Sequence, residues 1–270
     1  MPFITTRNAT LHYTVTGQGP FALLIQGVGA VGDVWRPQVE ALSGEFTCIT
    51  FDNRGIGRSA ATGALTIEDM ALDALAVLEA IGCERAHVAG HSMGGVIAQA
   101  VALAAAHRVE SLALLCTFRR GAQAAALTPA MIWRGLRTRI GTRAMRRRAF
   151  LEMILPDEFF TRVDVVALAE RYGALFARDL AEQPPIIMHQ LRALAAYDAG
   201  AALASLASIP TIVVSARHDR IASVAYGRAL ADAIPGAEFV ELHDAGHAAP
   251  IHVAHAVNAL LAAHWLAAGA

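Results

Sequence analysis

The stretch AHVAGHSMGG, residues 86–95, predicts a sharp turn between a buried strand and a helix. Residues 86–91 form a mainly apolar run typical of a strand, and the apolar residues after Ser92 continue for the length of a helix. Gly90 and Gly94 stand two positions before and after Ser92, where side chains would collide with neighbouring backbone in so tight a turn. The serine backbone is expected to be strained, with its hydroxyl exposed at the helix N-terminus. Ser92 is therefore the candidate nucleophile; the alternative is a glycine-rich turn with an incidental serine.

Strand-like and helix-like segments alternate on both sides of this turn. Strands are predicted at 11–17, 21–27, 46–52, 86–91, 109–117, 211–217 and 237–243. Helices are predicted from Thr66 to Ile81, at 93–106, at 223–234 and from the last strand to about Ala268. Thr66 and Asp69 approximate a capping box, and Gly82 closes that helix. The alternation predicts an α/β fold: a mostly parallel sheet of about eight strands with helices on both faces.

The alternation stops at Phe118 and returns only at residue 211. We predict that 118–208 is an inserted helical cap, and that 1–117 and 209–270 form the core domain. Capping residues divide the cap into four helices. The first begins at Thr128 and Pro129 and ends at Gly141, the second runs from Thr142 to before Pro156, and two more flank Pro184 and Pro185.

Composition limits the classes of function. The chain of 270 residues is 55% hydrophobic and 17% charged, enough for one large core. A net charge of -1 gives no overall basic field for nucleic acid, and no uncharged run is long enough to span a membrane. No signal peptide is recognised, and Cys48, Cys83 and Cys116 form no CxxC pair. We expect a reduced, cytoplasmic protein that acts on a small molecule, and a homodimer is left open.

A serine hydroxyl needs a base to remove its proton, and a histidine base needs a partner that holds its tautomer. His247 directly follows the predicted strand 237–243, and Asp219 directly follows the strand 211–217. Because the carboxyl ends of parallel strands share one edge, we expect Ser92, Asp219 and His247 to meet there. The rival base is His218, on the same loop as the acid, and the rival acid is Asp244, three residues before His247.

Together these residues resemble the α/β-hydrolase family over essentially the whole chain. The segment DNRGIGRS, residues 52–59, looks like the family's DxRGxGxS segment, in which we expect Arg54 to anchor a loop. Residues 26–29 occupy the position of the family's HGxG loop. The resemblance implies that the backbone N–H groups of Val28 and Met93 form an oxyanion hole, and that no metal or organic cofactor is required. Gln26 departs from the family pattern, because histidine is usual there.

The predicted cap is rich in arginine and in apolar side chains. The chain has no lysine, and nine of its 22 arginines fall within 119–148, where no aspartate or glutamate occurs. This cluster either attracts an anionic substrate, a CoA thioester or an acidic partner, or it pairs with the eight acidic residues of 152–198. Most apolar cap residues are expected to pack the short helices. Gln26, Trp133 and Met188 are the candidate substrate contacts, for a small to medium apolar or aromatic substrate.

The resemblance and the serine nucleophile favour acyl chemistry. The preferred function is a serine hydrolase that cleaves a carboxylic ester, lactone or enol-lactone. The first alternative is a C–C bond hydrolase, a cofactor-free haloperoxidase or perhydrolase, or a lyase on the same three residues, because the GHSMGG and SARHDR motifs resemble both enol-lactonases and haloperoxidases. The second alternative is a hydrolase-fold receptor with slow or no turnover.

Overall fold

A computed structural model describes residues 2–63, 65–125, 128–161 and 163–269. Its centre is a twisted sheet with the strand order β1-β2-β4-β3-β6-β7-β8-β9, and the short β5 pairs with β2. The strands are β1 (Phe3–Thr5), β2 (Ala9–Thr16), β3 (Phe21–Ile25), β4 (Thr47–Phe51), β5 (Ala60–Ala61), β6 (Ala86–His91), β7 (Val109–Leu115), β8 (Thr211–Ala216) and β9 (Glu238–Leu242). From β4 to β9 all neighbouring strands are parallel, and β1 and β2 are antiparallel. The predicted α/β fold is confirmed.

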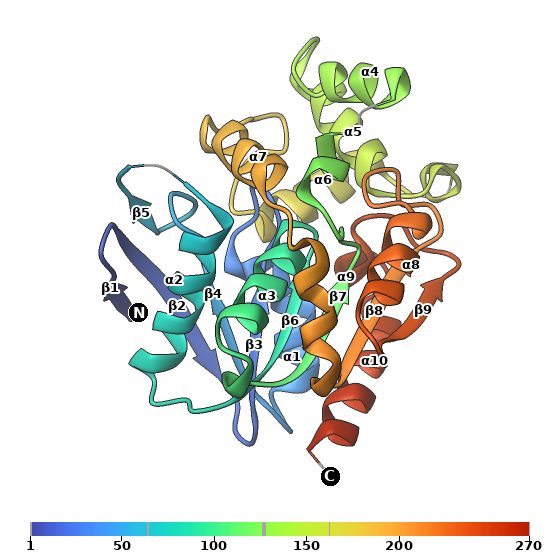
Figure 1. Ribbon diagram of the computed structural model, residues 1–270. Coiled ribbons are helices and arrows are strands. Elements are labelled where there is room, and N and C mark those ends of the chain that lie inside the picture. The colour runs from blue at the N-terminus through green and yellow to red at the C-terminus, as the bar shows by residue number, and fades with distance from the viewer. Residues whose placement is uncertain (1, 64, 126–127, 162, 270) are drawn as a thin grey trace.

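Helices cover both faces of the sheet (Figure 1). The helices are α1 (Arg36–Leu42), α2 (Ile67–Ala80), α3 (Met93–Ala104), α4 (Pro129–Arg137), α5 (Arg143–Ile154), α6 (Val165–Leu175), α7 (Ile186–Ala196), α8 (Val224–Ala233), α9 (Ala249–His252) and α10 (Ala254–Ala268). The described residues also form the 3-10 helices η1 (Gly32–Trp35), η2 (Ala106–Arg108), η3 (Gly121–Ala125), η4 (Asp157–Thr161) and η5 (Gly200–Ser208). None of the described helices combines the length and apolarity that crossing a bilayer requires.

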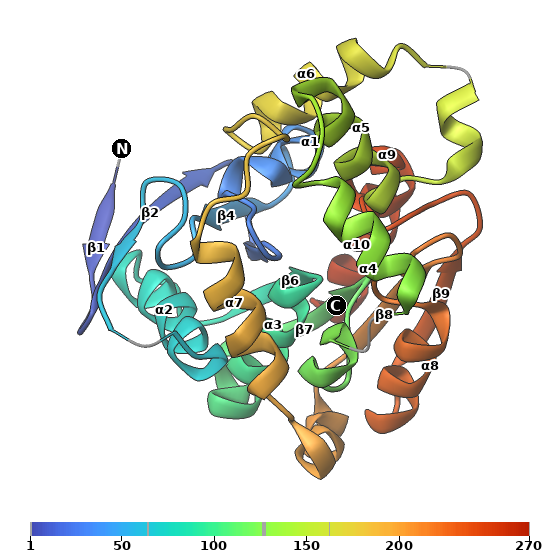
Figure 2. The same ribbon diagram turned by 90° about the horizontal axis from the view of Figure 1, so that it is seen from above.

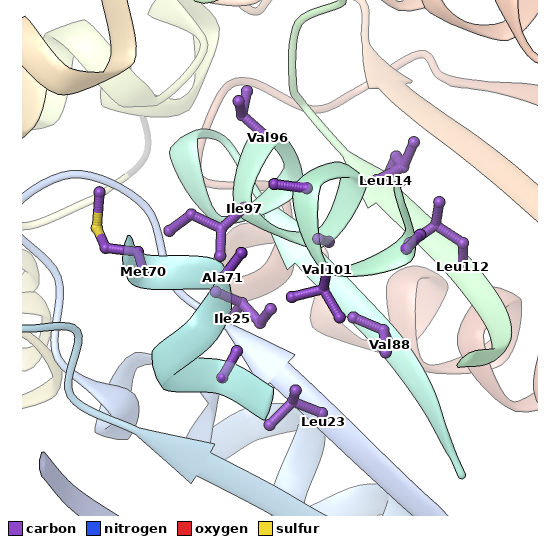
Figure 3. Packing of buried hydrophobic residues seen from close by; sticks show 14 of the residues in the cluster. Leu23, Ile25, Met70, Ala71, Val88, Val96, Ile97, Val101, Leu112 and Leu114 are labelled. Carbon is purple, nitrogen blue, oxygen red and sulfur yellow. The ribbon is translucent and has the colours of Figure 1, made fainter. Parts of the chain in front are cut away.

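The strand β3 shows how a continuous apolar sequence is used on both faces. Leu23 and Ile25 point into the cluster made with α2, α3 and α8, whereas Ala22 and Leu24 point into the cluster made with α1 and α10. Figure 3 shows the first cluster, with side chains of β3, β6 and β7 packed against α2 and α3. Successive strand residues face opposite sides, so a strand buried on both faces must be apolar throughout.

The segment between β7 and β8 carries the helices α4 to α7, which lie over one end of the sheet (Figure 1). Seen from above, α7 stands apart from α5 and α6 (Figure 2). A buried cluster of Phe150, Leu151 and Tyr172 with Val34 and Ile56 docks α5 and α6 on the core. The residue boundaries 118 and 208 of the cap stay a prediction.

Some elements differ from the sequence prediction. The helix α4 ends at Arg137 and not at Gly141, because the N–H groups of Thr138 and Arg139 bond to carbonyls only three residues back, which closes the helix with a tight turn. The strands β1 and β5 and the helix α1 were not predicted. They have three, two and seven residues respectively, too few for a clear periodic pattern.

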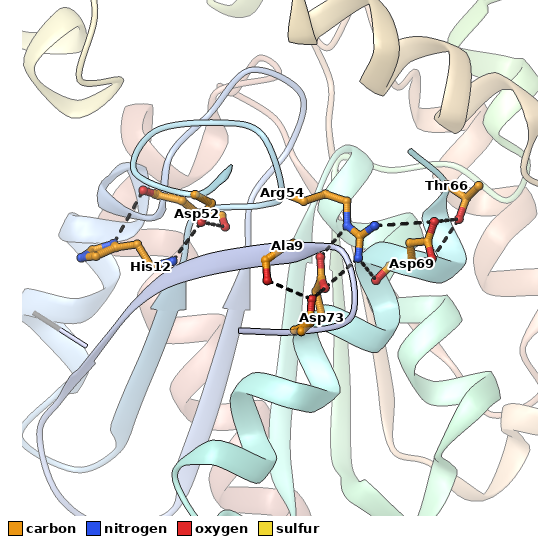
Figure 4. Close-up of polar contacts among 9 residues, drawn as sticks. Ala9, His12, Asp52, Arg54, Thr66, Asp69 and Asp73 are labelled. Carbon is orange, nitrogen blue, oxygen red and sulfur yellow. Dashed lines mark hydrogen bonds and ion pairs between the residues drawn. The ribbon is translucent and has the colours of Figure 1, made fainter. Parts of the chain in front are cut away.

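Arg54 holds the loop after β4 to the helix α2 (Figure 4). Its Nε donates to Asp73 Oδ2 at 2.7 Å and its Nη2 donates to Asp73 Oδ1 at 2.8 Å. Both residues are buried, with 4% and 1% of their surface exposed, and the paired Asp73 raises the pKa of Arg54. The expected role of Arg54 as a loop anchor agrees with this contact. Asp52 acts similarly nearby, accepting from the backbone N–H groups of Gly32 and Arg58.

The buried pair yields a prediction about stability. Asp73→Ala should lower the free energy of unfolding by about 3 kcal/mol, because it removes both short bonds to the buried Arg54 charge and leaves as its remaining ion pair the longer contact of 3.6 Å with the partly exposed Asp69. Glu110→Ala is the matched control: it breaks the exposed pair with Arg85 and should cost less than about 1 kcal/mol. Urea denaturation measures both. Equal losses in the free energy of unfolding would show that the buried pair stabilises the fold no more than the pair of Arg85 and Glu110 does.

Candidate active site

Ser92 lies at the sharp turn from β6 into α3, and its backbone is in the left-handed region with φ 56° and ψ -122°. The backbone is crowded around it. A Cβ on Gly90 would lie 2.2 Å from the Gly94 carbonyl oxygen, and a Cβ on Gly94 would lie 2.1 Å from that of Ile25. The Ser92 N–H donates to Leu115 O, and Thr117 Oγ1 donates to Ser92 O at 2.6 Å. The strained turn is therefore held by β7 and by two positions that only glycine fits.

Three side chains form a hydrogen-bonded chain at this turn. Ser92 Oγ lies 3.0 Å from His247 Nε2, and His247 Nδ1 lies 2.7 Å from Asp219 Oδ2. A carboxylate only accepts, so the Nδ1–H of His247 is the donor and its Nε2 accepts the proton of the Ser92 hydroxyl. All three residues are buried, with at most 7% of their surface exposed. The structure thus brings together the three residues that the sequence selected, and the arrangement can transfer the hydroxyl proton to the imidazole.

The rival residues His218 and Asp244 do not take part in the hydrogen bonds that link Ser92, His247 and Asp219. Asp219 follows β8, and its other oxygen, Oδ1, accepts from the N–H groups of Ile221 at 2.7 Å and Ala222 at 2.8 Å. These bonds fix the carboxylate in one orientation. Asp244 is exposed, and within the described chain neither Asp244 nor the side chain of His218 is bonded to His247.

His91 and Cys116 lie next to these three residues, and His91 has a role that the sequence did not indicate. The Nε2–H of His91 donates to the backbone carbonyl of His247 at 2.7 Å, so the residue before the nucleophile holds the loop of the base. Burial lowers the pKa of His91 to about 3, which keeps the ring neutral. Burial and then the Asp219 carboxylate raise the pKa of the Cys116 thiol. Cys48, Cys83 and Cys116 are all buried and free, as expected.

The loop 26–29 lies against Ser92. A Cβ on Gly27 would be 3.5 Å from Ser92 Oγ, and neither the Val28 nor the Met93 N–H has an acceptor within the described residues. Both groups are thus available to an incoming oxygen. Gln26 is 1% exposed and lines the adjacent cavity. The backbone carbonyl of Gln26 accepts a hydrogen bond from Asn53 Nδ2, so the loop is anchored without a histidine.

The cap also holds this loop, through a residue that the sequence reasoning missed. Gln190 Oε1 on α7 accepts from the Gly29 N–H at 2.8 Å. Gln190 is fully buried, and its Nε2 has no partner among the described atoms. Nothing in the sequence around Gln190 marks it, because its importance depends on how α7 docks over a loop more than 150 positions away in the chain.

A cavity of about 440 Å³ connects Ser92 and His247 with the cap. The apolar cap residues at its wall include Met131, Ile132, Phe150, Met153, Ile154, Phe176, Ile187, Met188, Leu191 and Leu194. Two of the three predicted contacts, Gln26 and Met188, line it. Trp133 does not: its side chain is 62% exposed on α4 and outside the cavity wall. No group of three or more His, Cys, Asp or Glu side chains suited to a metal ion is found in the described parts of the chain.

Most arginines of the 119–148 cluster have acidic partners in the cap. Five of the nine form ion pairs with residues of the predicted acidic stretch: Arg120 with Asp198, Arg137 and Arg148 with Glu152, and Arg143 and Arg147 with Asp179. These contacts favour the paired interpretation of the cluster for those five residues. Arg147 holds the pKa of Asp179 well below its usual range.

Comparison with known proteins places the chain among α/β hydrolases. Residues 23–252 match the family described as alpha/beta hydrolase fold. The chain is 31% identical to RutD of Azorhizobium caulinodans, named as a carbamate hydrolase, over 92% of each protein. It is similar to the structure of the enol-lactonase from Burkholderia xenovorans LB400, with 30% identity, a TM-score of 0.81 and coverage of 97% and 99%. BpoC of Mycobacterium tuberculosis H37Rv, named as a non-heme bromoperoxidase, gives 27% identity, a TM-score of 0.83 and coverage of 96% and 97%.

The crowding at the turn predicts a large effect of one methyl group. Gly90→Ala should lower the free energy of unfolding by about 3 kcal/mol or more, because the added Cβ overlaps the Gly94 carbonyl and neither backbone segment is free to move. Gly44→Ala is the control, since a Cβ there meets no atom within 4 Å and should change stability by less than about 0.5 kcal/mol. Thermal unfolding followed by circular dichroism compares them. A Gly90 variant as stable as the control would contradict the steric argument.

Proposed function

Because this chain belongs to the alpha/beta hydrolase fold family, we propose that it is a serine hydrolase that cleaves a carboxylic ester, lactone or enol-lactone through an acyl-enzyme. The observation that carries the proposal is the hydrogen-bonded chain from Ser92 through His247 to Asp219 at the wall of a mainly apolar cavity. Geometry of this kind activates a hydroxyl for attack on a carbonyl carbon.

In the first half of the proposed reaction, Ser92 Oγ attacks the carbonyl carbon and its proton moves to His247 Nε2. Asp219 accepts from His247 Nδ1–H and stabilises the imidazolium that forms. The negative charge on the former carbonyl oxygen is stabilised by the N–H groups of Val28 and Met93, the second of which is at the N-terminus of α3. The imidazolium then gives its proton to the leaving alkoxide, and the alcohol departs.

In the second half, water replaces the alcohol. His247 Nε2 takes a proton from the water, the hydroxide adds to the acyl carbon, and the same two N–H groups stabilise the second oxyanion. Collapse of this intermediate expels Ser92 Oγ, which regains its proton from His247, and the carboxylic acid is released. The proposed cycle uses only these side chains, the backbone and water.

The substrate class follows from the cavity and the relatives. A volume of about 440 Å³ with mainly apolar walls suits a small to medium acyl or aromatic group. The enol-lactonase from Burkholderia xenovorans LB400 supports a cyclic ester as substrate, and RutD supports hydrolysis of a carbonyl compound with a heteroatom leaving group. Ester and lactone cleavage share the same bond-forming and bond-breaking steps, except that the hydroxyl formed from a lactone stays attached to the acyl group and is released with the acid.

A second candidate function is supported by the similarity to BpoC. If hydrogen peroxide replaces water as the second nucleophile, the acyl-enzyme yields a peracid in place of an acid, with no other change in the steps. Comparing the rate on p-nitrophenyl esters with peracid formation from acetate and hydrogen peroxide separates the two functions. We favour hydrolysis, because water needs no additional binding site.

The nucleophile assignment predicts loss of both labelling and turnover on Ser92→Ala. The wild-type chain should react with a fluorophosphonate and hydrolyse esters in a panel of varied acyl length, and the variant should do neither. The expected loss of turnover is on the order of 10⁴-fold to 10⁶-fold. Circular dichroism checks that the variant is folded. A variant that keeps more than a few per cent of activity would show that Ser92 is not the nucleophile, and a wild-type chain that binds ligands without labelling would favour a receptor.

The acid assignment predicts a contrast between two carboxylates. Asp219→Asn should lower kcat by about 10⁴-fold, because an amide in place of the carboxylate favours the wrong tautomer of His247. Asp244→Asn is the matched control at an exposed position and should keep kcat within about twofold. Steady-state kinetics on one ester decides between them. The reverse order of losses would assign the acid to Asp244.

A further inference from the structure

Arg178 is a cation inside the wall of the cavity that holds Ser92. It follows α6, is half-buried, and lies beside a pair of contacting aromatic rings: its guanidinium carbon is 5.5 Å from the centre of Phe150 and 5.7 Å from that of Phe176. The rest of the cavity wall is mainly apolar. A charged group in this position is unusual unless an opposite charge compensates it.

The described residues compensate this charge only in part. Burial lowers the pKa of Arg178, and the nearby carboxylates of Glu182 and Asp179 raise it without forming an ion pair with it. Among the described residues, Arg178 is hydrogen-bonded only through Nη1, to the backbone carbonyls of Glu182 at 2.5 Å and Asp179 at 3.5 Å. Its Nε is buried without a hydrogen-bond partner, and no acceptor for Nη2 and no ion pair of Arg178 is found among the described residues. The neighbouring carboxylate of Asp179 is already engaged by Arg143 and Arg147. The edge of the guanidinium that carries Nε and Nη2 is therefore free of protein acceptors.

This edge lies near the proposed site of reaction. Arg178 Nη2 is 3.6 Å from the position that a Cβ on Gly29 would take, and Ser92 Oγ is 3.5 Å from the corresponding position at Gly27. Both groups thus contact the same three-residue loop, whose Cα atoms span at most about 7 Å. A substrate whose carbonyl lies at Ser92 and which extends a few bonds along this loop reaches Arg178.

We propose that the substrate carries a carboxylate, and that the Nε–Nη2 edge of Arg178 binds it while the ester or lactone carbonyl lies at Ser92. The inference rests on the proposed hydrolase function of the same cavity and names its substrate class. Two adjacent N–H donors in one plane match the two oxygens of a carboxylate, and the apolar surroundings strengthen the attraction. Burial removes water from the Arg178 guanidinium and thereby lowers its pKa. A bound carboxylate compensates for the lost hydration.

A single negative charge fits the cavity better than a phosphate does. The wall contains two more arginines, but Arg220 is occupied by Asp157 and by two backbone carbonyls, and Arg139, which follows α4, is exposed to solvent and donates to Met188 Sδ. Arg178 is thus the arginine of this wall that combines partial burial with free donors, and one guanidinium balances one carboxylate. The remainder of the ligand is expected to be apolar, as the walls are.

Binding to the Ser92→Ala variant tests the subsite without turnover. The probes are the monomethyl ester of glutarate and methyl glutaramate, in which a neutral amide replaces the carboxylate at equal size. Calorimetry should show about tenfold or stronger affinity for the anion. Adding Arg178→Gln should abolish this preference, whereas adding Arg192→Gln, which removes an exposed arginine on α7 outside the cavity wall, should leave it unchanged. Equal affinities for the two probes, or a preference that survives Arg178→Gln, would overturn the inference.

Kinetics on the wild-type background separates the subsite from the reaction. Mono-p-nitrophenyl esters of succinate, glutarate and adipate are compared with their terminal amides, and kcat/KM should favour the acids by about tenfold or more through Arg178. In Arg178→Gln the ratio of kcat/KM for each acid to that for its amide should fall to about one. Turnover of acids and amides at equal rates would reject the carboxylate subsite and leave the hydrolase function intact. Selective binding of the anion with no turnover of any ester would reject the hydrolase function and leave the subsite intact.

A second variant covers the case in which Arg178→Gln does not fold. Arg178→Lys keeps the charge but replaces the two adjacent donors with a single ammonium group. It should keep part of the preference for the anion and bind it more weakly than arginine does. An anion preference equal to that of the wild-type chain would show that the Nε–Nη2 edge is not the binding group.

Discussion

The left-handed backbone at Ser92 is the constraint on which the candidate site depends. A non-glycine residue in this conformation costs free energy, and it persists only where the surroundings leave the chain no alternative. Here those surroundings are the close approach of Gly90 and Gly94 to neighbouring backbone and the bonds of Ser92 to Leu115 and Thr117. The parallel strands β3, β6 and β7 hold the backbone of Ser92 in this strained conformation. The result is a hydroxyl held in one position above the sheet edge, toward which the loops after β8 and β9 bring Asp219 and His247.

The cap is part of the candidate site as well as its cover. Gln190 on α7 holds the loop of Gly29, and the carbonyl of Ile154 at the end of α5 accepts from the N–H of Ala248, next to His247. Arg220, next to Asp219, donates to the carbonyls of Glu152 and Leu155. Each of the three loops that form the site therefore has a bond to the cap. A displacement of the cap would alter the oxyanion loop, the base and the acid together.

Arginine serves two different purposes in the cap. Five residues of the 119–148 cluster form ion pairs within the cap. Arg148 pairs with Glu152 one turn away on α5, whereas the other four link segments farther apart in sequence, and Asp179 joins α5 to the segment after α6. Such pairs on the surface contribute little stability each but orient short helices. Arg178 differs from them because its guanidinium faces a mainly apolar cavity and forms no ion pair with the described residues. Sequence position does not distinguish Arg178 from its neighbours; only its surroundings do.

The sequence by itself determined the features that depend on neighbouring residues. The period-2 and helical patterns predicted the α/β fold, the glycines around Ser92 predicted the turn, and the order of strands placed Asp219 and His247 at the edge where the structure has them. The capping residues Thr66, Thr128 and Thr142 marked three helix starts, because a cap is a contact within one turn of chain.

Only the tertiary structure decided which side chains share the cavity. Met188 lines it and Trp133 does not, although both are apolar residues of amphipathic cap helices. The sequence analysis also did not predict three further features. These are the contact of Gln190 with Gly29, the hydrogen bond from His91 to the His247 carbonyl, and the unpaired edge of Arg178. Local patterns show which face of a helix is apolar, but not how that helix is rotated and placed against loops up to 160 residues away. That placement is set by the packing of the whole cap on the core, which no short stretch of sequence encodes.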